Sequence, residues 1–314
     1  MKVLVAGCGS IGQRHIRNLQ NLGQDVVAWD TDIPTREKVA RELNIPIRNP
    51  HDGISVDAVV IATPPDSHLH YMAWAIEQGY PMFVEKPLSW DLHGLELVLS
   101  QAKKQNLPIL VGYNLRWHWG LQMVRQLLPS LGKPISARAE FGQYLPNWHP
   151  TQDYRKGYTS KLGIILDGSH EIDYMRWLMG EVSRVFCLAG HLSQLEVNCE
   201  DTAEILMEFE SGAFGSIHLD FIQREYSRFL KIVCEDGIIT WEPEKVGYYL
   251  HGDWKEVSGE WGISETYVME MKHFLSCIQG SSQPLSSGED VLKTLKVAIA
   301  AKESAHMGGA LKLW

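Results

Sequence analysis

Residues 1–12 read Met1-Lys2-Val3-Leu4-Val5-Ala6-Gly7-Cys8-Gly9-Ser10-Ile11-Gly12, a short apolar run followed at once by Gly-x-Gly-x-x-Gly. In a strand–turn–helix unit, Gly7 permits the tight turn, Gly9 lets backbone approach a ligand, and Gly12 lets the helix pack on the strand. A helix that starts here directs its free N–H groups and positive dipole end at an anion. The stretch predicts a site for the pyrophosphate of a dinucleotide.

The residues that follow support this interpretation. A helix is expected over 11–22 and a second apolar strand over 25–29, ending at Asp30. An acidic side chain about 20 residues after the glycines bonds the ribose hydroxyls and repels a 2′-phosphate, so Asp30 favours NAD. Arg36 follows and keeps NADP open as an alternative. The competing interpretation is a glycine-rich turn beside a solvated aspartate.

Bulk composition limits the class of protein. The 314 residues suffice for two domains, and 45% apolar content is ordinary for a globular chain. A net charge of −9, without basic runs, argues against nucleic-acid or membrane partners and favours a small-molecule substrate. Five scattered cysteines without Cys-x-x-Cys indicate reduced thiols and no metal site. With no signal peptide or membrane span, we expect a cytoplasmic protein.

Short apolar strands alternate with amphipathic helices in the first part of the chain, as a doubly wound parallel sheet requires. We therefore expect an α/β nucleotide-binding domain over residues 1–118. Its further helices are expected over 34–43, 68–78 and 90–105, and its further strands over 58–62, 82–84 and 109–111.

Residues 119–314 have a different hydrophobic pattern from the first part of the chain, because apolar and polar residues alternate along the expected strands. The pattern predicts an α+β domain with a mostly antiparallel open sheet. Strands are expected over 136–145, 183–191, 203–209, 216–221, 229–234, 237–241 and 247–251, and helices over 166–179, 265–279 and 288–306. The last helix is expected to pack back on the first domain.

Two segments carry candidate catalytic groups. Lys86 follows the strand 82–84, at the sheet edge where ligands bind in such folds. His170 lies in Leu166-Asp167-Gly168-Ser169-His170-Glu171-Ile172-Asp173, with a carboxylate three residues to either side. An imidazole oriented by a carboxylate can take the proton of a hydroxyl during alcohol oxidation. The competing interpretations are a surface lysine and a structural histidine.

With these residues in place, the chain resembles the glucose-fructose oxidoreductase, inositol dehydrogenase and MocA family. The matching landmarks, in the family's order, are Gly7 to Gly12, Ala62-Thr63-Pro64-Pro65 with His68, Glu85-Lys86-Pro87, Gly112-Tyr113-Asn114-Leu115-Arg116, and Asp167 to Asp173. The resemblance implies that Lys86 and His170 face the nicotinamide and the substrate carbinol. It implies cofactor contacts by Gly7, Gly9, Ser10, Ile11, Gly12, Asp30, Thr63, Pro64, His68, Glu85 and Lys86, and it suggests a cis Lys86–Pro87 bond.

One position departs from the family pattern. The family often has an aspartate four residues before the histidine, whereas here position 166 is leucine and Asp167 comes three residues before. Either a loop shorter by one residue lets Asp167 reach His170, or another carboxylate orients the ring. Asp173 is the other candidate, although a helix-surface role is expected for it.

The run 144–155 is polar and aromatic, which suits a sugar ring with apolar C–H faces and many hydroxyls. Trp148, Tyr154 and Arg155 are therefore candidate substrate contacts, or else a structural aromatic cluster. Asn114 and Arg116 are expected either to bind substrate or to tie the domains together. An uncovered sheet face, together with the resemblance, predicts a homodimer or homotetramer.

The sequence thus predicts an NAD-dependent oxidoreductase that removes a hydride from a carbinol carbon of a sugar, polyol or sugar derivative. Lys86, His170 and Asp167 are its expected catalytic residues. Two alternatives remain. One is a redox-assisted glycosidase that recycles its NAD, and the other is a cofactor-binding regulator that has lost the reaction.

Overall fold

The chain folds as two compact units. The computed structural model describes residues 1–148, 154–156, 158–159, 161–259 and 262–313. The first unit comprises Met1–Asn114 and Ser264–Leu292, and the second comprises Leu115–Ile263 and Lys293–Trp314. Residues 264–292, which the sequence analysis assigns to the second domain, therefore belong to the first unit.

The first unit contains a five-stranded parallel sheet in the order β2-β1-β3-β4-β5. Its strands are β1 (Lys2–Ala6), β2 (Asp25–Trp29), β3 (Ala58–Ile61), β4 (Met82–Val84) and β5 (Ile109–Val111). Every residue of β3, β4 and β5 is buried, as expected for strands covered on both faces. The predicted doubly wound α/β fold is confirmed.

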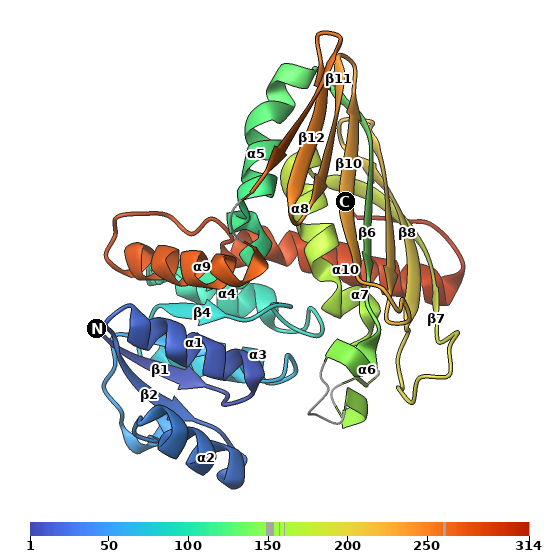
Figure 1. Ribbon diagram of the computed structural model, residues 1–314. Coiled ribbons are helices and arrows are strands. Elements are labelled where there is room, and N and C mark those ends of the chain that lie inside the picture. The colour runs from blue at the N-terminus through green and yellow to red at the C-terminus, as the bar shows by residue number, and fades with distance from the viewer. Residues whose placement is uncertain (149–153, 157, 160, 260–261, 314) are drawn as a thin grey trace. The chain divides into compact units, whose positions relative to one another are not determined.

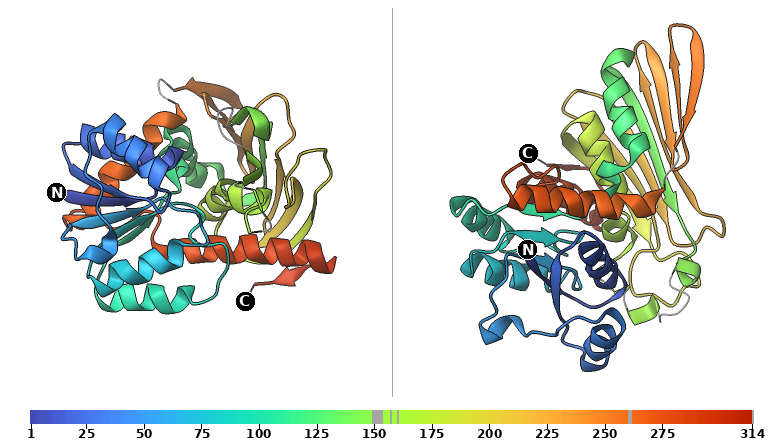
Figure 2. Two further views of the ribbon diagram at one scale, coloured as in Figure 1. Left: turned by 90° about the horizontal axis from the view of Figure 1, so that it is seen from below. Right: turned by 60° about the vertical axis from the view of Figure 1, so that its left-hand side comes forward.

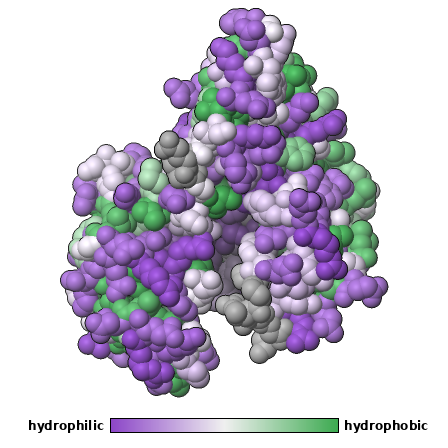
Figure 3. Space-filling model, viewed as in Figure 1, coloured by the Kyte–Doolittle hydropathy of each residue, from purple (hydrophilic) through white to green (hydrophobic). Residues whose placement is uncertain are grey.

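Helices cover both faces of this sheet, with α1 and α9 on one side and α3 and α4 on the other (Figure 2). The helices are α1 (Ser10–Asn21), α2 (Ile33–Leu43), η1 (Pro50–Asp52), α3 (His68–Glu77), α4 (Leu95–Lys104) and α9 (Ile263–Ile278). The predicted start of α4 at residue 90 is wrong, because Gly94 adopts a left-handed conformation and the helix begins after it. Hydrophilic side chains predominate on the visible face of this unit (Figure 3).

Helix α9 and the segment after it belong to the first unit because their side chains complete its core. Phe274 packs against Phe83 of β4 with ring centroids 5.9 Å apart. The Ser286 hydroxyl donates to the carbonyl of Val111 at 2.6 Å, at the end of β5. These contacts join residues more than 150 positions apart, which local periodicity does not predict.

The second unit contains a nine-stranded sheet in the order β13-β12-β11-β10-β6-β9-β8-β7-β14. Its neighbouring strands are antiparallel except for the parallel pair β6–β9, which confirms the predicted mostly antiparallel sheet. The strands are β6 (Pro134–Gly142), β7 (Val182–Gly190), β8 (Thr202–Phe209), β9 (Phe214–Asp220), β10 (Ser227–Cys234), β11 (Gly237–Glu242), β12 (Lys245–Leu250), β13 (Asp253–Ser258) and β14 (Leu311–Lys312). The sequence analysis does not predict β13 and β14.

Helices α5, α7 and α8 lie against one face of this sheet (Figure 1). The helical segments are η2 (Asn114–Trp117), α5 (Trp119–Leu127), η3 (Leu128–Leu131), α6 (Leu145–Trp148), η4 (Tyr154–Lys156), α7 (Ile164–Asp167), α8 (Ser169–Met179) and α10 (Gly288–Met307). On strands β7, β8 and β9, large apolar side chains are exposed at Leu188, Leu206 and Phe214. In the part of the chain that is described, no helix is long and apolar enough to cross a membrane.

Candidate functional site

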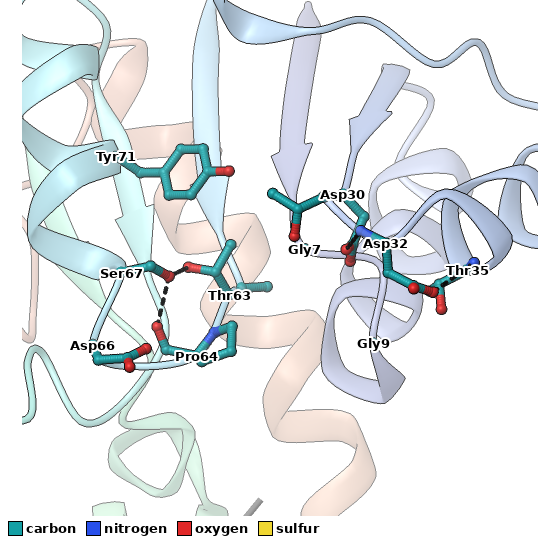
Figure 4. A pocket seen from close by; sticks show the side chains of 12 residues that line it. Gly7, Gly9, Asp30, Asp32, Thr35, Thr63, Pro64, Asp66, Ser67 and Tyr71 are labelled. Carbon is teal, nitrogen blue, oxygen red and sulfur yellow. Dashed lines mark hydrogen bonds between the residues drawn. The ribbon is translucent and has the colours of Figure 1, made fainter. Parts of the chain in front are cut away.

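A pocket of about 560 Å³ lies at the carboxyl ends of β1, β2 and β3 in the first unit. This edge is where ligands bind in open parallel sheets. Gly7, Asp30 and Asp32 lie on one side of the pocket, and Thr63, Ser67 and Tyr71 on the other (Figure 4). The complete lining is Gly7, Gly9, Asp30, Thr31, Asp32, Thr35, Ala62, Thr63, Pro64, Asp66, Ser67 and Tyr71.

The three glycines differ in the space around them. Gly7 has φ +101°, and a Cβ there would lie 2.2 Å from the carbonyl oxygen of Ala62. A Cβ on Gly12 would lie 2.0 Å from the carbonyl oxygen of Gly7. A Cβ on Gly9 would meet no atom within 4 Å, so the protein leaves the space above Gly9 open. Gly7 and Gly12 therefore serve the packing of the turn, and Gly9 borders the pocket.

Helix α1 starts at this open space. Gly9 is its N-cap residue, and no side chain accepts a hydrogen bond from the first turn. Ser10 and Ile11, two of the predicted cofactor contacts, lie in that turn. The first N–H groups of a helix have no acceptor within the helix, and with the positive end of the helix dipole they form an anion site. A pyrophosphate fits this position.

Asp30 is held at the end of β2 by backbone donors. Its Oδ2 accepts a hydrogen bond from the N–H of Cys8 at 2.7 Å, and its Oδ1 accepts one from the N–H of Asp32 at 2.9 Å. Arg36 donates to the carbonyl oxygen of Asp30 and stacks over the Trp29 ring at 4.5 Å. Asp30 and Asp32 lie on the same side of the pocket, so a 2′-phosphate bound there would meet two acidic side chains.

The glycines provide a matched test of this site. Gly12→Ala is expected to lower the melting temperature, because its Cβ collides with backbone that cannot move cheaply. Gly9→Ala is expected to leave the melting temperature within about 2 °C and to weaken NAD binding by at least about tenfold, since the new methyl group enters the open space. Thermal unfolding and calorimetric titration with NAD measure both effects. Wild-type affinity in Gly9→Ala would mean that the dinucleotide does not pass over this residue.

The loop after β3 is held in place by the buried side chain of His68. Its Nε2 lies 2.8 Å from the carbonyl oxygen of Thr63, and its Nδ1 lies 3.1 Å from that of Pro87. The ring is fully buried, and burial lowers its pKa. Thr63 and Pro64 line the pocket, whereas His68 supports the loop that presents them. The cofactor contact that the resemblance implies for His68 stays a prediction.

Lys86 follows β4 at the same edge of the sheet, and the Lys86–Pro87 bond is cis, as the resemblance suggests. The preceding residue, Glu85, is buried and uses both carboxylate oxygens. Its Oε1 lies 2.6 Å from Nε2 of His15, and its Oε2 accepts the backbone N–H of Lys86 at 3.0 Å. Glu85 therefore fixes the main chain that carries Lys86.

A second carboxyl group lies beside this pair. Side-chain atoms of His15, Glu85 and Glu270 lie within 4.8 Å of one another, and Glu270 of α9 is completely buried. Among the described residues, neither carboxyl oxygen of Glu270 has a hydrogen-bond partner. Burial and the charge of Glu85 raise the pKa of Glu270 well above its ordinary value, and Arg14 opposes them. Glu270 therefore keeps its proton to a higher pH than an exposed glutamate does.

This protonation predicts a pH-dependent stability difference. A folded-state pKa above the unfolded value means that the unfolded chain ionises first, so the wild type loses stability as the pH rises above about 4.5. Glu270→Gln removes that loss. The stability of the variant relative to wild type, and with it the melting temperature, should rise from pH 5 to pH 8, by up to about 1.4 kcal/mol for each pH unit below the folded-state pKa. The exposed Glu265→Gln on α9 is the control. A constant difference across this range would contradict the prediction.

In the second unit, His170 and Asp167 lie at a junction of two helices. Asp167 is the last residue of α7, and His170 lies in the first turn of α8 with 9% of its surface exposed. The hydroxyl of Tyr158 donates to Oδ2 of Asp167 at 3.0 Å. Burial and the Asp167 charge raise the pKa of Tyr158 far above its ordinary value, so the phenol remains a donor.

Asp173 is not the helix-surface carboxylate that the sequence analysis expects. It is 1% exposed and accepts hydrogen bonds from Nε and Nη2 of Arg116, at 2.8 and 2.7 Å. The hydroxyl of Thr294 also donates to it at 3.0 Å. The expectation fails because α8 is buried along most of its length. Arg116, a predicted substrate contact, forms this buried ion pair within the second unit.

The remaining predicted substrate residues occupy different surroundings. Asn114 is buried and donates to the hydroxyl of Thr266 at 2.5 Å within the first unit. Trp148 packs edge-on against Phe141 in the second unit. Tyr154 is half-buried, and the exposed Arg155 pairs with Glu196 at 3.0 Å. Residues 149–153 of the predicted polar-aromatic run lie outside the described residues.

Sequence reasoning missed several residues that the structure brings to these sites. Ser67 and Tyr71 line the pocket from the α3 region, and His15, Glu270 and Tyr158 support predicted residues. His15 follows Gly12 by three residues on α1, so the fingerprint itself points to the same helix face. No local signal connects Glu270 with Glu85, because they lie on distant segments.

Family models match most of the chain. The oxidoreductase family with an NAD-binding Rossmann fold matches residues 1–113, and the GFO/IDH/MocA C-terminal domain matches residues 121–240. Myo-inositol 2-dehydrogenase of Thermotoga maritima is 26% identical, and the match covers 100% of this chain and 98% of that protein. The scyllo-inositol 2-dehydrogenase (NAD(+)) of Bacillus subtilis is also 26% identical, with coverages of 100% and 96%.

A solved structure shares the fold along the whole chain. An oxidoreductase from Agrobacterium radiobacter, crystallised with NAD+, L-tartaric acid and magnesium, matches with a TM-score of 0.90 at 21% identity, covering 100% of this chain and 98% of that one. The glycine turn, the uncapped α1 and the anchored Asp30 agree with the family description of the first domain. The chain belongs to the GFO/IDH/MocA family of oxidoreductases, and its first part is the NAD-binding Rossmann domain of that family.

Proposed function

We propose that this protein is an NAD-dependent dehydrogenase that oxidises a secondary alcohol of a polyol, sugar or sugar derivative. The observation that carries the proposal is the pocket at the carboxyl ends of β1 to β3, where the open Gly9, the uncapped α1 and the fixed Asp30 suit NAD. The substrate class is inferred from relatives named inositol 2-dehydrogenases, which cover the full chain.

The acidic lining supports NAD over NADP. A 2′-phosphate would add negative charge beside Asp30 and Asp32, and the described lining of the pocket contains no lysine or arginine. The guanidinium of the neighbouring Arg36 is bonded to the carbonyl oxygen of Asp30. The hydrogen bonds from Thr35 lower the pKa of Asp32, so this carboxyl group remains ionised. NADP is therefore expected to be a much poorer cofactor than NAD.

In the proposed mechanism, His170 takes the proton of the substrate hydroxyl. The carbinol C–H bond breaks as the C=O bond forms, so the alcohol gives one proton to His170 and its second hydrogen leaves with two electrons as a hydride. Bound NAD supplies the acceptor for that hydride. The Lys86 ammonium group donates a hydrogen bond to the reacting oxygen, and the Asp167 carboxylate stabilises the imidazolium that forms.

Support for these roles comes from each unit separately. The Glu85 carboxylate accepts a hydrogen bond from the N–H of Lys86, and this bond holds the backbone of Lys86 at the carboxyl edge of its sheet. His170 and Asp167 lie close in sequence at the α7–α8 junction. The assignment of His170, Lys86 and Asp167 as the catalytic groups is our proposal.

NADH formation at 340 nm, measured with inositols, aldoses, polyols and nucleotide sugars, tests the function. We expect at least one substrate to give stoichiometric NADH, with NAD+ preferred to NADP+. Calorimetric binding of NAD without turnover across the panel would support a regulator instead. Cleavage of a glycoside without net NADH would support a redox-assisted glycosidase.

We also propose that the open face of the nine-stranded sheet joins a second copy of the chain as a homodimer or homotetramer. Leu188, Leu206 and Phe214 are between 53% and 62% exposed on the adjacent strands β7, β8 and β9. Apolar side chains gathered in this way usually mark a partner surface.

A further inference from the structure

We propose that Tyr158 is a positioning residue for the reaction, because its hydroxyl holds the carboxylate of Asp167 in one orientation. The inference rests on the proposed function, in which Asp167 acts with His170. Tyr158 precedes Asp167 by nine residues, and its hydroxyl donates to Oδ2 at 3.0 Å. The sequence analysis left open whether Asp167 or another carboxylate orients His170.

The backbone of Asp167 is already fixed by its helix. Its N–H donates to the carbonyl of Gly163 at 3.0 Å, and the N–H of Gly168 donates to that of Ile164 at 2.7 Å. A Cβ on Gly168 would lie 2.8 Å from the same Ile164 oxygen, so the chain turns tightly directly after Asp167. The hydrogen bond from the Tyr158 hydroxyl constrains the side-chain torsion of Asp167.

Tyr158 is itself well anchored. Its ring is 7% exposed and packs edge-on against Phe221 with centroids 4.9 Å apart. Its backbone carbonyl accepts a hydrogen bond from the N–H of Asn198 at 3.4 Å. Phe221 directly follows β9, so the phenol is fixed to the sheet of the second unit and not to α7 alone.

The phenol remains a neutral donor at every working pH. Burial is the main cause of its raised pKa, and the charges of Asp167 and Cys199 add to it. The other charged groups around Cys199 are Glu200, Asp201 and Lys302, and Lys302 pairs with Glu200 at 3.2 Å. A donor that cannot ionise gives the carboxylate a hydrogen bond that is constant through the catalytic pH range.

The test is Tyr158→Phe, which keeps the ring against Phe221 and removes one hydroxyl. We expect kcat to fall about 5- to 50-fold, the acidic limb of the kcat/KM profile to move to higher pH, and the dissociation constant for NAD to stay within twofold. Tyr174→Phe is the matched control. It is another buried phenol of the second unit, its hydroxyl lies 3.5 Å from Glu171, and its removal should leave kcat and the pH profile unchanged.

A double-mutant cycle with Asp167→Asn separates positioning from general destabilisation. If Tyr158 acts through Asp167, then Tyr158→Phe should cost little further kcat in the Asp167→Asn background. An equal loss in both backgrounds, or a wild-type pH profile in Tyr158→Phe, would overturn the inference. Absence of NADH formation by the wild type across the whole substrate panel would overturn the proposed function instead, so the two failures are distinguishable.

Discussion

Replacing His170 with alanine is expected to lower kcat by 10²- to 10⁴-fold, the range that a positioned general base contributes. His170 lies in the first turn of α8, near Asp167 in sequence, and the NAD pocket is built from the first unit. The dissociation constant for NAD should therefore change far less than kcat. Steady-state kinetics with the substrate found by the NADH panel, together with calorimetry, measures both quantities.

The control for this variant is His191→Ala in the same unit. His191 is 39% exposed and lies 3.5 Å from Asp201, away from the α7–α8 junction in sequence. Its removal should leave kcat within about twofold. If His170→Ala kept wild-type turnover, the proton would have to leave the substrate through another group, and the assignment of the base would be wrong.

Breaking the Arg116–Asp173 pair is expected to cost about 3–5 kcal/mol of unfolding free energy, because it leaves an uncompensated buried charge. Both residues are 1% exposed, and two hydrogen bonds of 2.7–2.8 Å join them. Arg116→Met should show this loss in urea denaturation. The double variant Arg116→Met/Asp173→Met should recover most of it, since it removes both buried charges together.

An exposed ion pair of the same unit provides the comparison. Arg155 and Glu196 are 53% and 71% exposed, so Arg155→Met should cost less than about 1 kcal/mol. A small loss in Arg116→Met would show that the guanidinium is replaceable at this position. Arg116 would then be a better candidate for the substrate role that the sequence analysis gives it.

Local pattern predicted much of the first unit. The strands at 25–29, 82–84 and 109–111 were predicted with the observed bounds, because short apolar runs between turn signals leave little choice of period. In the second unit, alternation of apolar and polar residues predicted most of the sheet. Strand β13 was missed because all of its residues are exposed, so it carries no one-sided apolar pattern.

Among the residues of the candidate site, too, some were predicted from local sequence and others were not. The glycine turn and Asp30 were predicted from the strand–turn–helix pattern, and the Glu85–Lys86–Pro87 segment from its place after a strand and from the family resemblance. Each of these lies at or next to the end of its own strand. Glu270 and Tyr158 were not predicted. Glu270 reaches Glu85 from α9, and Tyr158 reaches Asp167 from a separate segment, so neither contact has a local signature.

The sequence by itself determined the parallel-sheet nucleotide domain, its cofactor edge and the residue types available for alcohol oxidation. These depend on periodicity and on glycine conformations that are confined to a few neighbouring residues. Only the tertiary structure shows that α9 completes the first unit, that Asp173 pairs with Arg116, and that the Tyr158 hydroxyl donates a hydrogen bond to Asp167. Such contacts join separate segments of the chain, and their free energy depends on burial that exists only once the elements have packed.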